Sequence, residues 1–128
     1  MTFSLVISDA HRLATGTLSG SVRGSDIAAA IQTLYDDPAW QPGFDTFWDC
    51  AGITELLFER EDLPNIVALQ HASSERAGTG IEIILVARML DDAMASMYRV
   101  AMRTEVRAVH ICRSVCDAER LLGRSIWT

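Results

Sequence analysis

Lysine is absent from this sequence of 128 residues, so each of its 11 basic residues is an arginine. Aspartate and glutamate together number 17, which gives a net charge of −6. The arginines are scattered along the chain and do not form the basic stripe that contacts with a phosphate backbone require. The sequence therefore predicts no nucleic-acid partner.

Long hydrophobic runs are absent too. The longest aliphatic run covers residues 83–87, whereas a membrane helix needs about 20 apolar residues. The first residues carry neither the basic start nor the small-residue cleavage site of a secretory signal. Hydrophobic residues make up 49% and charged residues 22%, as in an ordinary globular domain. We expect a single domain over residues 1–128, without membrane insertion and in the cytoplasm.

Cysteine is scarce, with Cys50, Cys112 and Cys116 as its three members. An odd number argues against a disulfide framework, and the last two lack the C-x-x-C spacing of redox and zinc sites. The segment Gly78-Thr79-Gly80 precedes a strand, whereas a phosphate-binding loop joins a strand to a helix. We therefore expect no bound metal and no cofactor.

Strand and helix patterns alternate along the chain. Residues 2–8, 12–19, 44–49, 81–88 and 106–113 are the expected strands, and helices are expected to begin near Ser25, Glu59, Asp91 or Asp92, and Ser114. Pro38 ends the first helix, and a loop is expected over residues 50–58. The order ββαβαβαβα predicts an α/β fold, with about four helices on a mixed, mostly parallel sheet of about five strands.

An opening hairpin followed by three strand–helix units resembles the SpoIIAA-like (STAS) fold. More narrowly, the chain is similar to small bacterial stand-alone proteins of the STAS/SEC14-like group. The resemblance is carried by Phe47-Trp48-Asp49 at a strand end, by residues 37–44 at a helix end, and by Asp62-Leu63 at a helix start. It covers roughly residues 2–124 and implies a non-enzymatic module that binds a protein partner or a second copy of itself.

Anti-sigma-factor antagonists of this fold carry a phosphorylatable Ser after the third strand, within a pattern similar to Asp-x-Ser-Gly-Val. Residues 49–53 match this pattern as Asp-Cys-Ala-Gly-Ile, with Ala51 in place of the Ser. Thr54 is the hydroxyl residue nearby. The resemblance therefore implies the fold without the usual phosphorylatable Ser.

Candidate ligand- or partner-binding residues gather where the third and the central strands are expected to end: Asp49, Cys50, Gly52, Thr54 and Arg88. Asp49 is expected either to orient a ligand or act as a base, or to accept hydrogen bonds from the backbone of residues 51–53. Arg88 is expected either to hold an anion or to pair with Asp91 or Asp92.

Nucleophilic chemistry at Cys50 needs a cation that lowers its pKa and a fold that brings His71 or His110 to it. His110 and Cys112 lie on the same side of the last expected strand, but two residues make at most half of a metal site. We therefore expect no catalytic residues and no metal ligands.

Three functions remain open from the sequence. The first, which we expect, is a non-enzymatic STAS-like interaction or regulatory module that contacts a protein partner, or forms a homodimer, through residues 49–58 and the neighbouring helix. The second is a protein that binds a small apolar ligand, favoured by the SEC14-like side of the resemblance, by the methionines of the third helix and by the apolar residues 56–58. The third is a small enzyme that uses Asp49 and Cys50.

Overall fold

The computed structural model describes residues 1–105, 107–124 and 126. Its five-stranded sheet has the order β1-β2-β3-β4-β5. The strands are β1 (Thr2–Ser8), β2 (Leu13–Arg23), β3 (Asp45–Leu57), β4 (Ile81–Leu85) and β5 (Ala108–Cys112). β1 is antiparallel to β2, and every other neighbouring pair is parallel, as the alternating sequence pattern predicts.

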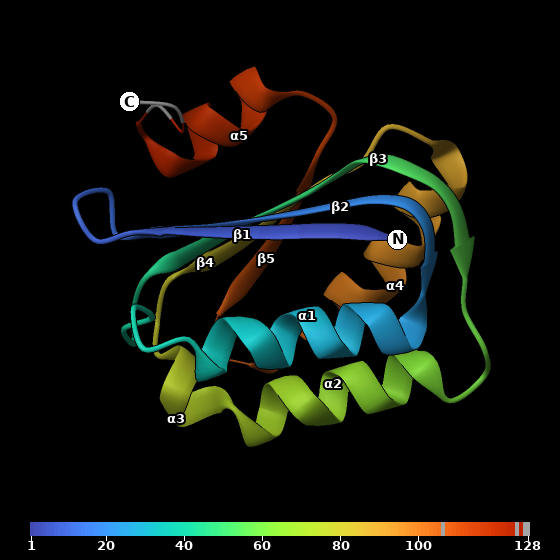
Figure 1. Ribbon diagram of the computed structural model, residues 1–128, viewed down its shortest axis with the longest axis horizontal. Coiled ribbons are helices and arrows are strands. Elements are labelled where there is room, and N and C mark those ends of the chain that lie inside the picture. The colour runs from blue at the N-terminus through green and yellow to red at the C-terminus, as the bar shows by residue number, and fades with distance from the viewer. Residues whose placement is uncertain (106, 125, 127–128) are drawn as a thin grey trace.

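The helices of the described chain are α1 (Gly24–Asp36), α2 (Asp62–Ala72), α3 (Ser74–Ala77), α4 (Met89–Ala101) and α5 (Val115–Leu122). The parallel strands lie side by side in chain order, and right-handed crossovers then place α1, α2 and α4 on the same face of the sheet. Figure 1 shows α1, α2 and α3 below the sheet and α5 above it. No helix within the described ranges is long and apolar enough to cross a membrane.

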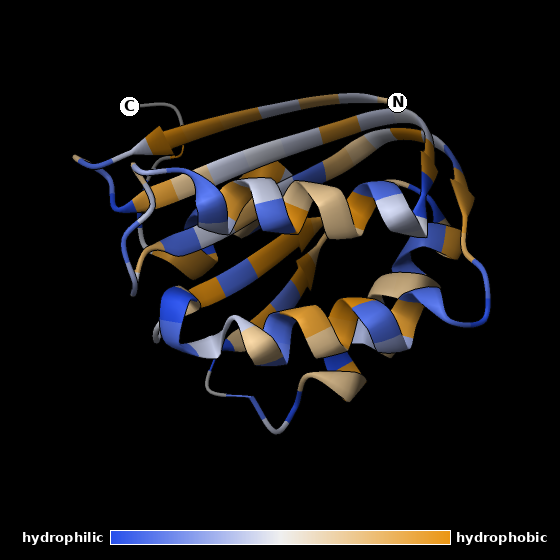
Figure 2. Cartoon of the chain, turned by 60° about the horizontal axis from the view of Figure 1, so that its bottom comes forward, coloured by the Kyte–Doolittle hydropathy of each residue, from blue (hydrophilic) through white to orange (hydrophobic). Residues whose placement is uncertain are grey.

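Two apolar cores lie on the two faces of the sheet. Successive residues of a strand point to opposite faces, so Trp48 and Ile84 join the core under α1, α2 and α4, whereas Phe47 and Ile83 join the core under α5. Figure 2 shows α1 and α2 side by side across the first of these faces. β4 is thus covered on both faces, as the apolar run that begins at Ile83 predicts.

The expected loop over residues 50–58 is wrong, because β3 continues to Leu57. β2 also runs further than expected, and its residues 19–23 supply the pairing partner for residues 52–57 of β3. The register shifts between Thr17 and Ser19 and again between Gly20 and Ser21. Extra residues at such bulges increase the local bend and twist of a strand, so the two strands form a curved extension of the sheet.

The second expected helix, over residues 59–76, is divided in two. α2 begins at Asp62 with Pro64 in its first turn, where proline is tolerated, and α3 follows after a break at Ser73. The described chain therefore has five helices, one more than expected. The last helix begins as predicted, because the Ser114 hydroxyl accepts a hydrogen bond of 3.1 Å from the Asp117 amide.

α4 begins earlier than expected. Arg88 occupies the N-cap position, and Asp91 and Asp92 lie within the first turn, where negative charge interacts favourably with the helix dipole. β4 and β5 are both shorter than expected. Val106, the expected first residue of the last strand, lies outside the described residues.

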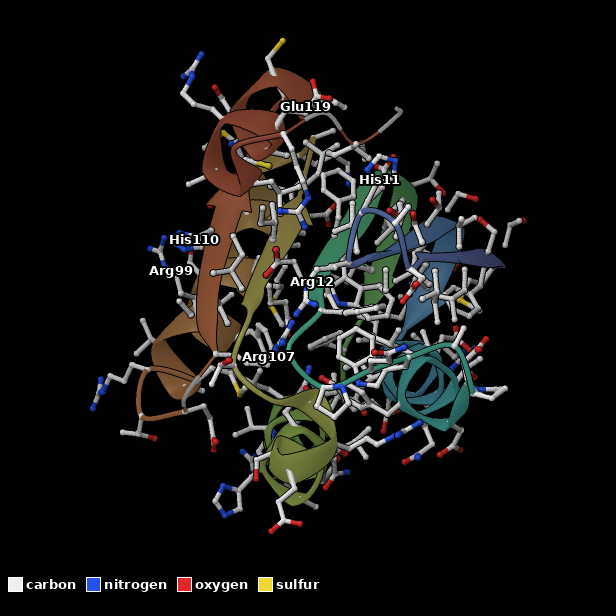
Figure 3. All side chains as sticks on the ribbon, turned by 90° about the vertical axis from the view of Figure 1, so that its left-hand side faces the viewer. His11, Arg12, Arg99, Arg107, His110 and Glu119 are labelled. Carbon is white, nitrogen blue, oxygen red and sulfur yellow. The ribbon has the colours of Figure 1, made fainter. Side chains whose placement is uncertain are left out.

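Arg107 forms hydrogen bonds at the end of the sheet where the parallel strands β3 and β4 begin. Its guanidinium donates hydrogen bonds to the carbonyl oxygens of Phe44 (3.0 Å), Ala77 (3.3 Å) and Ile81 (3.1 Å) and to the Thr46 hydroxyl (3.2 Å). Figure 3 shows Arg107 reaching into the interior, whereas the labelled Arg99 and His110 lie on the outside. One buried side chain thus connects β3, β4 and α3.

Candidate functional site

A cavity of about 90 Å³ lies between the sheet and α1, α2 and α4. Its wall is mostly apolar and includes Ile31 of α1, Trp48 and Ile53 of β3, Ile66 of α2, and Met94 of α4. Ile84 of β4 also lines this space and is only half-buried, although its strand lies between two neighbours. The cavity therefore lies within the core of the domain and is open to solvent on one side.

The unequal lengths of neighbouring strands create this cavity. β4 pairs with β3 only as far as the Leu85–Asp49 pair, whereas β2 and β3 remain paired as far as Arg23 and Leu57. The longer pair of strands continues beyond the end of β4 and contributes Ile53 to the wall. The cavity thus lies at the carboxyl ends of the parallel strands, where α/β sheets commonly bind ligands.

A buried carboxylate forms the polar part of the cavity wall. Glu82 of β4 is 3% exposed and lines the cavity. The Tyr98 hydroxyl donates a hydrogen bond of 2.8 Å to Oε1 of Glu82, and Nε2 of Gln70 donates to Oε2 across 3.3 Å. Gln70 also donates to the Tyr98 hydroxyl and accepts from the Tyr35 hydroxyl, both at 2.9 Å. Every side-chain donor of the two tyrosines and the glutamine is therefore used within one network.

Burial controls the ionisation of this network. Desolvation raises the pKa of Glu82, although the hydrogen bond from Tyr98 and the charge of Arg107 act in the opposite direction. Desolvation, followed by the negative charge of Glu82, also raises the pKa of Tyr35 and of Tyr98. Both phenols therefore remain hydrogen-bond donors throughout the ordinary pH range.

Arg88 pairs with Asp91, which also lines the cavity. Nε and Nη2 of Arg88 donate to the two carboxylate oxygens of Asp91 across 2.9 and 2.7 Å, the two-point geometry that a guanidinium favours. Nη1 of Arg88 donates to the carbonyl oxygen of Thr54. Of the two roles considered from the sequence, the structure shows the aspartate pair, which joins the start of α4 to β3.

Cys50 lies on the cavity wall without a base beside it. Burial, aided by the nearby carboxylates, raises the pKa of its thiol to about 12, so the reactive thiolate is scarce near neutral pH. His71 is exposed and pairs with Glu105 across 2.8 Å, and His110 is in register with Ile83 and so lies on the other face of the sheet. The part of the chain that the structure describes has no cluster of three or more His, Cys, Asp or Glu residues placed to hold a metal ion.

Asp49 lies on the other side of β3 from the cavity, because its neighbours Trp48 and Cys50 both face the cavity. Its Oδ1 accepts a hydrogen bond of 3.1 Å from the Ala51 amide, which is the local role considered from the sequence. Gly52 is exposed and does not line the cavity. Of the candidates named from the sequence, Cys50 lies on the cavity wall and Arg88 pairs with Asp91 on that wall, whereas Asp49 and Gly52 do not line the cavity.

The outer side of α4 carries an uncovered apolar surface. Its exposed members are Met89 (82% exposed), Leu90 (69%), Met97 (54%) and Val100 (54%). Helical spacing places these four residues on one half of the outer side, and we call them the α4 apolar face. Arg99 is exposed on the other half, and Arg103 is exposed in the turn that follows the helix. Helical spacing in the sequence predicts Met97 on the inner side together with Met94 and Tyr98. This prediction is wrong, because apolar residues surround most of this helix and the sheet covers only one side.

Sequence reasoning missed the importance of Glu82. The residue interrupts an otherwise apolar strand, and a carboxylate in a strand that is covered on both faces has to be buried. A glutamate within an otherwise apolar strand is therefore the sequence feature that could have identified Glu82. Helical spacing predicts inward positions for Gln70 and Tyr98. Their contacts with Glu82 span 12 and 16 positions of the sequence, and periodicity does not reveal such contacts.

Comparisons with known proteins identify the fold. No protein-family model matches the chain, and no curated protein matches it in sequence. A solved structure of the anti-sigma factor antagonist SpoIIAA in its unphosphorylated form is similar to this chain, with a TM-score of 0.52 and 13% sequence identity. The match covers 95% of this chain and 99% of that one. The chain therefore has a SpoIIAA-like (STAS) fold.

Proposed function

We propose that this protein is a non-enzymatic STAS-like regulatory module of the cytoplasm that acts by binding another protein through the α4 apolar face. The observation that carries the proposal is the exposure of four large apolar side chains on one half of a single helix. Contiguous exposed apolar surface commonly marks an interaction site. The SpoIIAA-like fold supports the same reading, because the matched structure is that of an anti-sigma factor antagonist.

The charges beside the α4 apolar face indicate what a partner presents. Arg99 is exposed beside this face and Arg103 is exposed just after the end of α4. The salt bridges of the described residues include neither of them. A complementary partner surface is therefore apolar at its centre and acidic along one rim.

The candidate site supports a binding role better than a catalytic one. Cys50 has a raised pKa, and Glu82 lies 3% exposed within a closed hydrogen-bond network. Asp49 is turned to the other side of β3 and bonded to its own backbone segment. A nucleophile or base needs a reachable partner and a pKa matched to the task, and these side chains supply neither.

Affinity capture with paired variants tests this function. We expect wild-type protein and the Leu121→Glu control, which places a charge on exposed α5, to retain the same partner protein from cells that naturally produce the chain. The Leu90→Glu/Met97→Glu variant is expected to retain about tenfold less or lower, as for loss of central interface residues. Equal retention by all three proteins, or by none, contradicts the proposal.

The cavity favours a second candidate function, the binding of a small apolar molecule. An apolar space at the carboxyl ends of parallel strands has the character of a ligand site. Ala95→Leu adds bulk at the cavity wall, and Ala93→Leu adds the same bulk at an exposed position of the same helix. Native mass spectrometry is expected to show a retained molecule in wild type and in Ala93→Leu but not in Ala95→Leu. Identical bare masses for all three count against this function.

A further inference from the structure

Glu82 is a buried carboxylate that forms no salt bridge within the described residues, although the charge of Arg107 acts on it without a hydrogen bond between them. The chain contains no lysine, and none of the salt bridges among the described residues includes Glu82. Its hydrogen-bond partners, Tyr98 and Gln70, are neutral side chains. Buried charges in proteins are usually paired, and a buried carboxyl group without a salt bridge holds its proton more tightly, as the raised pKa of Glu82 indicates.

The hydrogen bonds already made leave Glu82 able to accept more. An ionised carboxylate offers about four lone-pair positions, and Tyr98 and Gln70 use one on each oxygen. The donors of Tyr35, Gln70 and Tyr98 are all engaged within the network. A molecule in the cavity therefore meets a hydrogen-bond acceptor at Glu82 and no free donor from these three side chains.

The other charged side chains around the cavity do not form a salt bridge with Glu82. Asp91 also lines the cavity, but Arg88 holds both of its oxygens. The guanidinium of Arg107 acts on Glu82 through its charge, but its hydrogen bonds go to backbone carbonyl oxygens and to the Thr46 hydroxyl, and none of them goes to Glu82. Ionised Glu82 thus has no salt bridge on the cavity wall, and because burial raises its pKa, a cationic group that pairs with it also favours its ionised form, whereas a carboxylate or phosphate does the opposite.

The size of the cavity limits the part of a ligand that it can enclose. Its volume of about 90 Å³ is smaller than the roughly 150 Å³ of an engineered protein cavity that binds benzene. A group of about four or five non-hydrogen atoms is therefore the scale of a fully enclosed ligand. Half-buried Phe58 and Met94 on the wall mark the side on which a longer apolar tail reaches solvent.

We propose that the cavity binds a small apolar molecule that carries a primary ammonium group, and that this group pairs with Glu82. The inference rests on the second candidate function above and adds the chemical class of the ligand. Pairing is favourable here because folding has already desolvated Glu82, so only the ammonium loses its water on binding. Alkyl carboxylates, which carry the opposite charge, are excluded.

Methyl NMR with labelled isoleucines tests the ligand class, because isoleucines lie on both faces of the sheet. Ile53 and Ile84 line the cavity, whereas Ile83 and Ile126 lie in the core under α5. The probes are isobutylamine, isobutanol and isobutyrate. We expect isobutylamine to shift the signals of Ile53 and Ile84, to leave those of Ile83 and Ile126 in place, and to bind at least about tenfold more tightly than isobutanol.

The variant Glu82→Gln removes the charge at nearly constant shape, and Glu75→Gln removes an exposed charge as the control. We expect Glu82→Gln to abolish the preference for isobutylamine over isobutanol and Glu75→Gln to retain it. If no probe shifts the cavity methyls, both the ligand-binding function and the inference fail. If isobutanol or isobutyrate binds wild type as tightly as isobutylamine, the cavity is a ligand site but the ammonium inference fails. If Glu82→Gln does not fold, the relative affinities of the three probes for the wild-type protein still test the ammonium inference.

Discussion

The hydroxyl of Tyr98 donates a hydrogen bond of 2.8 Å to Oε1 of Glu82, which joins the inner side of α4 to the wall of the cavity. The outer side of the same helix carries the α4 apolar face. The element that we propose to contact a partner is therefore attached to the carboxylate that we propose to contact a ligand. A ligand that pairs with Glu82 acts on a residue whose hydrogen bond positions α4.

The ionisation of Glu82 makes stability depend on pH. Its pKa is raised in the folded protein, so the folded state holds the proton more tightly than the unfolded chain does. This contribution is fully present below about pH 4.3, the usual pKa of glutamate, and is lost as the pH rises through the folded-state pKa. We expect the free energy of unfolding of wild type to fall relative to that of Glu82→Gln as the pH rises above about 4.3.

Urea unfolding of the two proteins at several pH values measures this difference. Tyr35 and Tyr98 do not titrate in the ordinary pH range, because their pKa values are also raised. The remaining ionisable groups are common to both proteins and cancel in the comparison. A difference that stays constant with pH, or that moves in favour of wild type as the pH rises, shows that Glu82 is not a buried group of raised pKa.

Cys50 is expected to react slowly with iodoacetamide. Burial raises the pKa of its thiol to about 12, and alkylation requires the thiolate. Cys50 is half-buried, Cys112 is buried with its pKa also raised, and Cys116 is exposed. Peptide mapping by mass spectrometry near neutral pH is expected to find Cys116 labelled first. Fastest labelling at Cys50 contradicts this expectation and restores the enzyme hypothesis.

Arg107 is expected to be a major source of stability. Arg107→Met leaves the oxygen atoms of Phe44, Ala77, Thr46 and Ile81 without their buried donor, and a loss of this kind costs about 2–4 kcal/mol in the free energy of unfolding. Arg99→Met removes an exposed arginine and is expected to cost less than about 0.5 kcal/mol. Urea unfolding that gives equal values for the two variants contradicts the role assigned to Arg107.

Local sequence patterns were sufficient for the order of the elements. Pro38 ends α1 and Ser114 begins α5, since both act through bonds and steric contacts within a few residues. The continuation of β3 past Asp49 was not predictable in this way. It depends on pairing with the second half of β2, roughly 30 residues earlier in the chain, and Gly52 taken alone favours a turn.

The candidate site was predicted less well, because it too depends on contacts between residues that are distant in sequence. Alternation along β3 placed Asp49 and Cys50 on opposite faces, although both were taken as members of one site. The cavity itself arises from the different lengths of β2, β3 and β4, which no local pattern encodes. Glu82 and Arg107 became important only through contacts with residues distant in sequence.

Photo-crosslinking in living cells tests the central claim, that the α4 apolar face binds a partner protein, most directly. A photoreactive phenylalanine analogue at position 97 replaces exposed Met97, and the same analogue at position 4 replaces exposed Ser4 of β1 as the control. We expect irradiation to join one partner protein to position 97 and not to position 4, with mass spectrometry separating another protein from a second copy of this chain. Chains that remain without an adduct at position 97, or that give the same adducts at both positions, contradict the claim.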